Sequence, residues 1–158
     1  MNISGYLSVE TITLDLKATD KNSAITELVG MLKKANKVKN CEETIEVLLQ
    51  REKLGSTGIG QGIAIPHGRM SSLKEQVIAL GISKTGLEFD SLDALPVNIC
   101  FLLVCPEDSG GQHLQAIALL SRLMKNKKNR QDMCAATTAQ EIIDIIKREE
   151  QRVMGAVA

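Results

Sequence analysis

Two histidines are the strongest candidates for chemistry in this sequence, because an imidazole near neutral pH can act as a nucleophile or a base. His67 follows a segment with glycines at 55, 58, 60 and 62, a short apolar run at 63–65, and Pro66. The loop, the apolar run and the proline together predict that His67 is presented at the end of a short strand, 62–65. Arg51 lies 16 positions before His67, and His113 lies 46 positions after it.

The glycine-rich segment does not fit the common nucleotide-binding loops. A P-loop requires a Gly-Lys pair, and the chain contains none. A dinucleotide fingerprint would need glycine at position 63, which is Ile63, and would need a helix to follow it. The alternative that stays open is a plain turn beside a structural histidine.

The motif around His67 resembles the phosphorylation site of a known family. LGSTGIG at 54–60 and GIAIPHG at 62–68 are similar to that site in the enzyme IIA domains of the bacterial phosphoenolpyruvate-dependent phosphotransferase system, fructose/mannitol class. Arg51 and His113 match the family's active-site arginine and second histidine, and the likeness extends from about residue 7 to about residue 148. The RExLGSTGIG form is most similar to the nitrogen-regulatory branch, where asparagine is expected in place of Gln61.

The resemblance implies that His67 accepts a phosphoryl group through Nε2, while a backbone carbonyl holds Nδ1. The donor would be phosphorylated HPr or its nitrogen-branch relative. Arg51 is expected to neutralise the phosphoryl charge, because guanidinium donors match phosphate oxygens. His113 is expected to donate to the phosphoryl group from the start of a helix. The alternative role of Arg51 is a solvated residue at a helix end, and that of His113 is a histidine paired with a backbone carbonyl.

Four further residues are predicted to bind the phosphoryl group: Ser56, Thr57, Gly58 and Gly68. Two hydroxyls and the backbone N–H groups of the loop can donate hydrogen bonds to an anion. Glycine allows the backbone to approach closely, since no Cβ intervenes. The alternative role of the hydroxyls is to stabilise the turn itself.

Composition limits the remaining possibilities. The length of 158 residues predicts a single domain, 1–158. The equal numbers of basic and acidic residues, 19 of each, argue against the basic surface that nucleic-acid binding requires. No apolar run is long enough to span a bilayer, and the N-terminus has no signal-peptide pattern. We therefore expect a cytoplasmic protein without direct membrane insertion.

Cysteine usage gives no indication of a metal or a cofactor. The four cysteines form no C-x-x-C pair, and with two histidines no ligand spacing is apparent. Cys100 and Cys105 are predicted to point to opposite faces of one strand, as free buried thiols. We expect no metal and no cofactor.

Hydrophobic periodicity predicts alternating strands and helices. Strands are expected at 12–16, 62–65, 77–83 and 97–105, with a hairpin within 85–95. Helices are expected at 22–35 and 42–52, after an S-x-x-Q capping box at 109–112, at 129–135, and after a second box at 138–141. Residues 151–158 are expected to form a frayed tail. This order predicts a three-layer α/β fold, a mixed β-sheet with helices on both faces.

Two functions follow from the resemblance. In the first, the chain is a regulator whose phosphorylation state controls its binding to other proteins. In the second, it is a sugar-transport relay that donates the phosphoryl group to a fructose/mannitol-type IIB domain. The first is favoured because the sequence contains no fused IIB or IIC region. An inert α/β scaffold with a histidine of no function is the remaining alternative.

Overall fold

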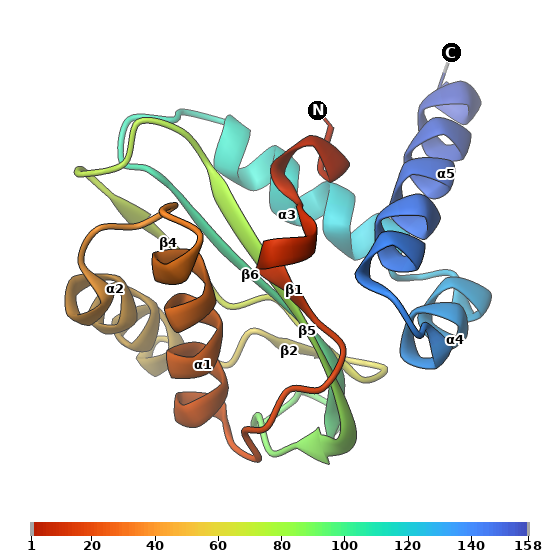
Figure 1. Cartoon of the computed structure of the whole chain (residues 1–158), viewed down its shortest axis with the longest axis horizontal. Helices are drawn as coiled ribbons and strands as arrows, with labels where there is room; N and C mark the ends of the chain where they lie inside the picture. Colours follow the sequence, from red (N-terminus) through yellow and green to blue (C-terminus); the bar gives the residue numbers. More distant parts are fainter. Residues whose placement is uncertain (1, 158) are drawn as a thin grey trace.

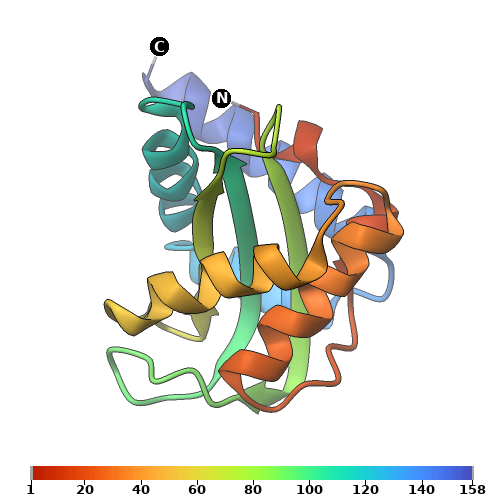
Figure 2. The ribbon, with the colours of Figure 1, turned by 90° about the vertical axis from the view of Figure 1, so that its left-hand side faces the viewer.

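The fold has three layers, as the sequence predicts. In the computed structural model, which describes residues 2–157, a six-stranded sheet lies between two groups of helices (Figure 1). Figure 2 views the sheet through the first group, which covers one face. This group comprises α1 (Lys21–Lys34) and α2 (Cys41–Lys53), and the second comprises α3 (Gln112–Leu123), α4 (Lys127–Ala135) and α5 (Ala139–Val157).

The sheet is mixed. Its order is β1-β5-β6-β3-β2, and β4 pairs with β6 further along the same strand. β5 and β6 are antiparallel, whereas β1 runs parallel to β5, and β3 and β4 run parallel to β6. The strands are β1 (Ile12–Thr13), β2 (Gly58–Gly60), β3 (Ile63–Ala64), β4 (His67–Met70), β5 (Val77–Leu87) and β6 (Val97–Pro106).

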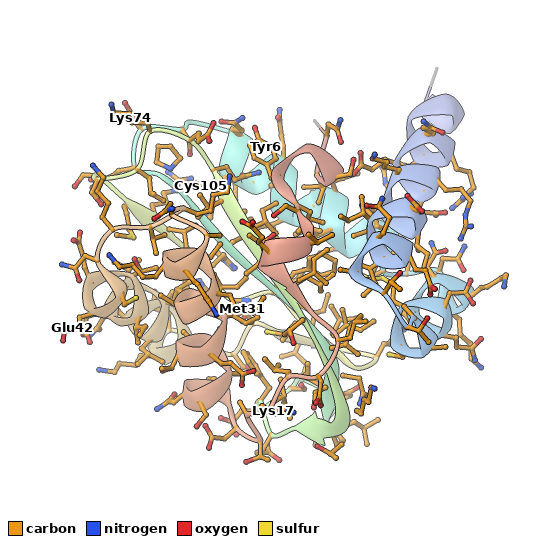
Figure 3. The ribbon with its side chains drawn as sticks, viewed as in Figure 1. Tyr6, Lys17, Met31, Glu42, Lys74 and Cys105 are labelled. Atoms are coloured by element: carbon orange, nitrogen blue, oxygen red, sulfur yellow. The ribbon has the colours of Figure 1, made fainter. Side chains whose placement is uncertain are left out.

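The central strand β6 is buried on both faces, which explains its nearly continuous apolar sequence. Its alternate residues enter two separate clusters: Phe101 and Leu103 pack with α3–α5, and Leu102 packs with α1 and α2. Cys100 and Cys105 fall in opposite clusters as free buried thiols, as predicted, whereas the free Cys41 is half-buried and the free Cys134 is exposed. Most charged side chains lie at the periphery, as Figure 3 shows for Lys17, Glu42 and Lys74.

Short polar side chains begin most of the helices. Asp20 caps α1 by accepting a hydrogen bond from the Ser23 backbone N–H at 2.8 Å, and Asn40 caps α2 in the same way. The capping box predicted at 109–112 is wrong, because α3 begins only at Gln112 and Gly111 occupies its N-cap without a side-chain hydrogen bond. The backbone makes this contact itself, since Gln112 N–H donates to the Ser109 carbonyl at 3.3 Å.

The C-terminal helix is longer than the sequence suggests. α5 continues to Val157 through the segment expected to fray, and position 158 lies outside the described residues. Val153 is only 8% exposed in the hydrophobic core and Arg152 pairs with Glu149, so this part of the helix is held by packing and charge. Thr138 caps its start by accepting from the Glu141 N–H at 3.2 Å. None of the helices within 2–157 combines the length and apolar character needed to cross a bilayer.

Candidate functional site

His67 begins a strand instead of ending one. The predicted strand 62–65 forms only at Ile63–Ala64, and β4 then starts at His67, in register with Leu103 of β6. Pro66 separates the two short strands, and its carbonyl accepts the Leu103 N–H at 2.9 Å. Both strands pair with β6, so the backbone of His67 is anchored to the most buried strand of the sheet.

The imidazole of His67 is held in one tautomer. Nδ1 lies 2.7 Å from the carbonyl oxygen of Ile65, and because a carbonyl can only accept, Nδ1 carries the proton. Nε2 therefore keeps its lone pair. Burial lowers the pKa of His67 and the Arg51 charge lowers it further, whereas the Ile65 hydrogen bond and the Glu52 charge partly oppose both. At neutral pH the ring is thus neutral, and Nε2 is the nitrogen that carries a free lone pair.

His113 lies beside His67 in the first turn of α3. Their ring centroids are 5.3 Å apart, and His113 is only 5% exposed. Burial lowers the pKa of His113 to about 4, with further contributions from His67 and Arg69. Its Nδ1 is buried and has no hydrogen-bond partner among the described residues. Buried polar atoms are normally paired, so this nitrogen is one of the exceptions among the described residues.

A hollow of about 470 Å³ opens in front of the two rings. Arg51 enters it from the last turn of α2, and its Nη1 donates to the Gly55 carbonyl at 2.9 Å. The hollow brings together four of the seven predicted site residues, His67, His113, Arg51 and Gly68. It is lined by Val47, Gln50, Arg51, Leu54, His67, Gly68, Arg69 and His113. An added Cβ on Gly68 would lie 2.6 Å from Val47 Cγ1, so glycine is needed where α2 crosses β4.

The other three predicted residues do not line the hollow. Ser56 Oγ donates to the Phe89 carbonyl at 2.7 Å and accepts from the Gly58 N–H at 3.1 Å. Thr57 is 4% exposed, and its hydroxyl donates to the carboxylate of Glu52. An added Cβ on Gly58 would lie 2.5 Å from the Ser91 Oγ. The hydroxyls of Ser56 and Thr57 thus hold the glycine loop in place, and Gly58 allows its close approach to Ser91.

Arg69 is a site residue that the sequence reasoning missed. It lies two positions after His67 on β4, so both side chains point to the same face of the strand. It lines the hollow, its Nη2 lies 3.5 Å from the Gly110 carbonyl oxygen, and its charge lowers the pKa of His113. Had a strand been predicted to start at His67, period-two alternation would have identified Arg69.

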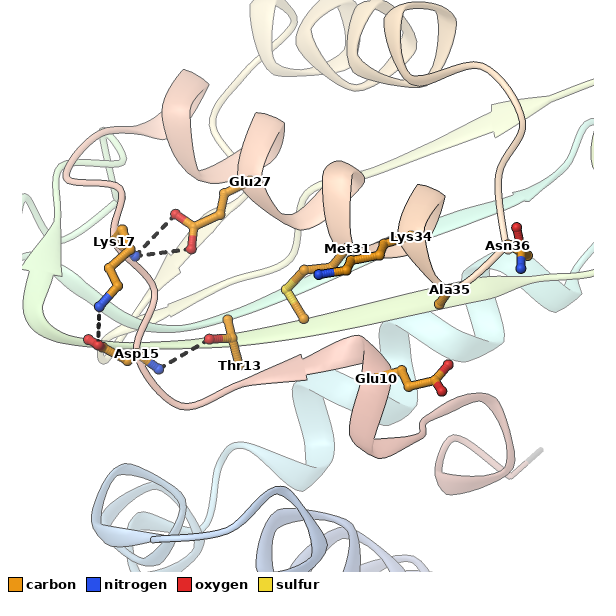
Figure 4. A pocket seen from close by; sticks show the side chains of 9 residues that line it. All are labelled: Glu10, Thr13, Asp15, Lys17, Glu27, Met31, Lys34, Ala35 and Asn36. Atoms are coloured by element: carbon orange, nitrogen blue, oxygen red, sulfur yellow. Dashed lines mark hydrogen bonds and ion pairs between the residues drawn. The ribbon is translucent and has the colours of Figure 1, made fainter.

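The larger hollows of the molecule lie elsewhere. One of about 680 Å³ opens between α1 and the segment around β1 (Figure 4). Three of its charged groups have partners: Glu27 accepts the backbone N–H groups of Lys17 and Ala18, and Lys17 pairs with Asp15. Among residues 2–157 no cluster of three or more His, Cys, Asp or Glu side chains could hold a metal ion. The two arginines make the His67 hollow suitable for an anion.

Comparison with known proteins gives consistent results. The chain is 36% identical over 151 residues to the PTS system fructose-specific EIIABC component of Bacillus subtilis (strain 168), covering 96% of this chain and 24% of that protein. It therefore spans about a quarter of that relative. It is 35% identical over 146 residues to a nitrogen regulatory protein of Bradyrhizobium diazoefficiens, covering 92% of this chain and 95% of that protein.

A solved structure has the same fold. The nitrogen regulatory protein IIA-Ntr from Neisseria meningitidis superposes with a TM-score of 0.85 at 33% identity, covering 91% of this chain and 98% of that one. The family model described as phosphoenolpyruvate-dependent sugar phosphotransferase system, EIIA 2, matches residues 5–149. The chain therefore belongs to the EIIA 2 family of the phosphoenolpyruvate-dependent sugar phosphotransferase system.

Proposed function

We propose that this chain is a cytoplasmic phosphoryl carrier that accepts a phosphoryl group on Nε2 of His67 from a phosphorylated HPr-type protein. The observation that carries the proposal is the 2.7 Å contact between His67 Nδ1 and the Ile65 carbonyl, which leaves Nε2 as the nucleophile. In the transfer, the Nε2 lone pair forms a new P–N bond. The P–N bond of the donor breaks, and its electron pair returns to the donor nitrogen.

The charges around the hollow support this role. Phosphoryl transfer requires mainly positioning and charge stabilisation from the protein. Arg51 and Arg69 supply two cations, and the N-terminus of α3, where His113 lies, adds the positive end of a helix dipole. A neutral His113 can donate one hydrogen bond to a phosphoryl oxygen without carrying charge itself.

The phosphorylation state is proposed to act mainly as a regulatory signal read by other proteins. Similarity over nearly the full length to nitrogen regulatory proteins favours this output. A relay that donates to a fructose/mannitol-type IIB domain is the second candidate, favoured by the fructose-specific relative at 36% identity. Adding a IIB domain and sugar to the labelled protein separates the two, because a relay loses the label from His67 and a regulator keeps it.

The phosphoryl carrier role is tested by labelling with phosphoenolpyruvate, enzyme I and HPr. We expect the wild type to take up label that is acid-labile and base-stable, His67→Ala to take up none, and His113→Ala to take up a reduced amount. The modified residue is mapped by mass spectrometry under mild base. Full labelling of His67→Ala, or an acid-stable phosphate, would overturn the proposal. His113→Ala removes the neighbouring imidazole while keeping His67, so its residual label separates an assisting role from the acceptor role.

A further inference from the structure

One buried carboxylate contacts the glycine loop that precedes His67. Glu52 is the neighbour of Arg51 at the end of α2 and is only 7% exposed. Its carboxylate accepts the Thr57 N–H at 3.2 Å and also the Thr57 hydroxyl. Lys21 of α1 lies 3.2 Å away, as Nζ to Oε2. Glu52 does not line the hollow around His67, so direct contact with a phosphoryl group does not explain it.

Backbone hydrogen bonds connect this carboxylate to the imidazole. The Thr57 carbonyl accepts the Ile65 N–H at 3.0 Å, and the Ile65 carbonyl contacts His67 Nδ1 at 2.7 Å. We propose that Glu52 is a positioning residue for the phosphoryl acceptor: it holds Thr57, Thr57 holds Ile65, and Ile65 fixes the Nδ1–H tautomer of His67. This inference rests on the proposed function, because it concerns the same nucleophile.

Lys21, which pairs with Glu52, also contacts the segment that follows β5. Lys21 Nζ also lies 3.4 Å from Asp90 Oδ2 and 5.3 Å from the centroid of the Phe89 ring. Glu52 thus joins α1, α2, the glycine loop and the segment that follows β5. Movement of the loop relative to the sheet would break contacts on several elements at once.

A carboxylate suits the buried position of Glu52, because three donors approach it. They are the Thr57 N–H, the Thr57 hydroxyl and the Lys21 ammonium. A carboxylate accepts at both oxygens, whereas glutamine has one acceptor oxygen and an NH₂ group that only donates. Glu52→Gln therefore places a donor against a donor in a buried site, where an unsatisfied polar group is costly.

The decisive measurement is the tautomer of His67, because loss of stability alone would not alter it. We expect long-range ¹H–¹⁵N NMR spectra at neutral pH to show the Nδ1–H form in the wild type. In Glu52→Gln we expect a substantial Nε2–H population, and a rate at saturating phospho-HPr that falls about tenfold while the half-saturating donor concentration stays within about twofold. Thr57→Ser, which keeps the hydroxyl, should retain the wild-type tautomer.

The chain offers a matched control. Glu150 is another buried carboxylate, 5% exposed, and its Oε1 accepts the Ser4 N–H at a distance of 2.6 Å. Neither residue lines the hollow around His67. Glu150→Gln should leave the His67 tautomer and the transfer rate unchanged. A folded Glu52→Gln protein with a wild-type tautomer and rate refutes the inference.

A second variant covers the case in which Glu52→Gln does not fold. Thr57→Val removes only the hydroxyl contact to Glu52, and we expect it to shift the tautomer in the same direction to a smaller extent. An unchanged His67 tautomer in Thr57→Val overturns the inference. The tautomer is measured without any phosphoryl transfer, so it judges the role of Glu52 even if labelling of His67→Ala shows that the proposed function is wrong.

Discussion

Phosphorylation of His67 should change the protonation of its buried neighbour. His113 is 5% exposed, its ring centroid lies 5.3 Å from that of His67, and its pKa is lowered to about 4. It is therefore neutral at pH 7 in the unphosphorylated protein. A phosphoryl group on Nε2 places negative charge at a similar distance, and negative charge favours the protonated imidazole.

The size of the effect follows from the separation of the rings. Two unit charges about 5 Å apart interact by about 3 kcal/mol at an effective dielectric constant of about 20, which corresponds to about two pKa units. The second charge of the phosphoryl group adds to this rise, and Arg51 and Arg69 offset part of it. We therefore expect the pKa of His113 to rise from about 4 to about 6.

The assay is a ¹⁵N NMR titration of the unphosphorylated and the phosphorylated protein. The chain has only two histidines, so His67→Ala identifies the signal of His113 directly. His67→Ala incubated with the same donor is the control, and its His113 pKa should not change. By linkage, protonation of His113 stabilises the phosphorylated state by the same free energy. A His113 pKa that stays near 4 after phosphorylation would refute the electrostatic reasoning.

Three further predictions concern single positions. Folding lowers the pKa of His113 from 6.5 to about 4. The free energy of unfolding should therefore fall by roughly 3 kcal/mol as the pH is lowered from 6.5 to about 4, and denaturation curves of His113→Gln should lack this loss. Arg69→Gln should shift equilibrium labelling about tenfold against the phosphorylated form, whereas Arg122→Gln, an exposed change on α3, should not. Gln61 has a φ of 58°, a left-handed conformation that asparagine adopts more readily than glutamine. Gln61→Asn should therefore stabilise the fold by about 0.5 kcal/mol. A lower Tm of the variant would contradict this.

The main layers of the fold could be predicted because their signals are local. The apolar run at 97–105 is long enough for a strand and too continuous for a surface element, so it predicted a central strand, which is β6. The spacing of apolar residues in 22–35 and 42–52 predicted α1 and α2 to within one residue at each end. In each case the side chains that determine the element lie within it.

The remaining elements depend on distant partners. HGRM at 67–70 has one apolar side chain, and it becomes β4 only because it pairs with Leu103–Pro106. Since this pairing was not predicted, Arg69 was missed, although His67, His113 and Arg51, which the sequence motif suggested for one site, line the same hollow. The start of α3 was wrong for a local reason, because a backbone turn replaced the side-chain cap at Ser109.

The register between His67 and Leu103 has a consequence for how a partner distinguishes the two states. In the proposed function the phosphoryl group is carried by a residue whose backbone pairs with a fully buried part of the sheet, since Leu103 is 0% exposed within β6. A covalent change on Nε2 would then alter the local electrostatic potential while the shape of the surface stays the same. A partner that discriminates the two states would do so through charge, and that discrimination should weaken as ionic strength rises and the Debye length falls below about 8 Å.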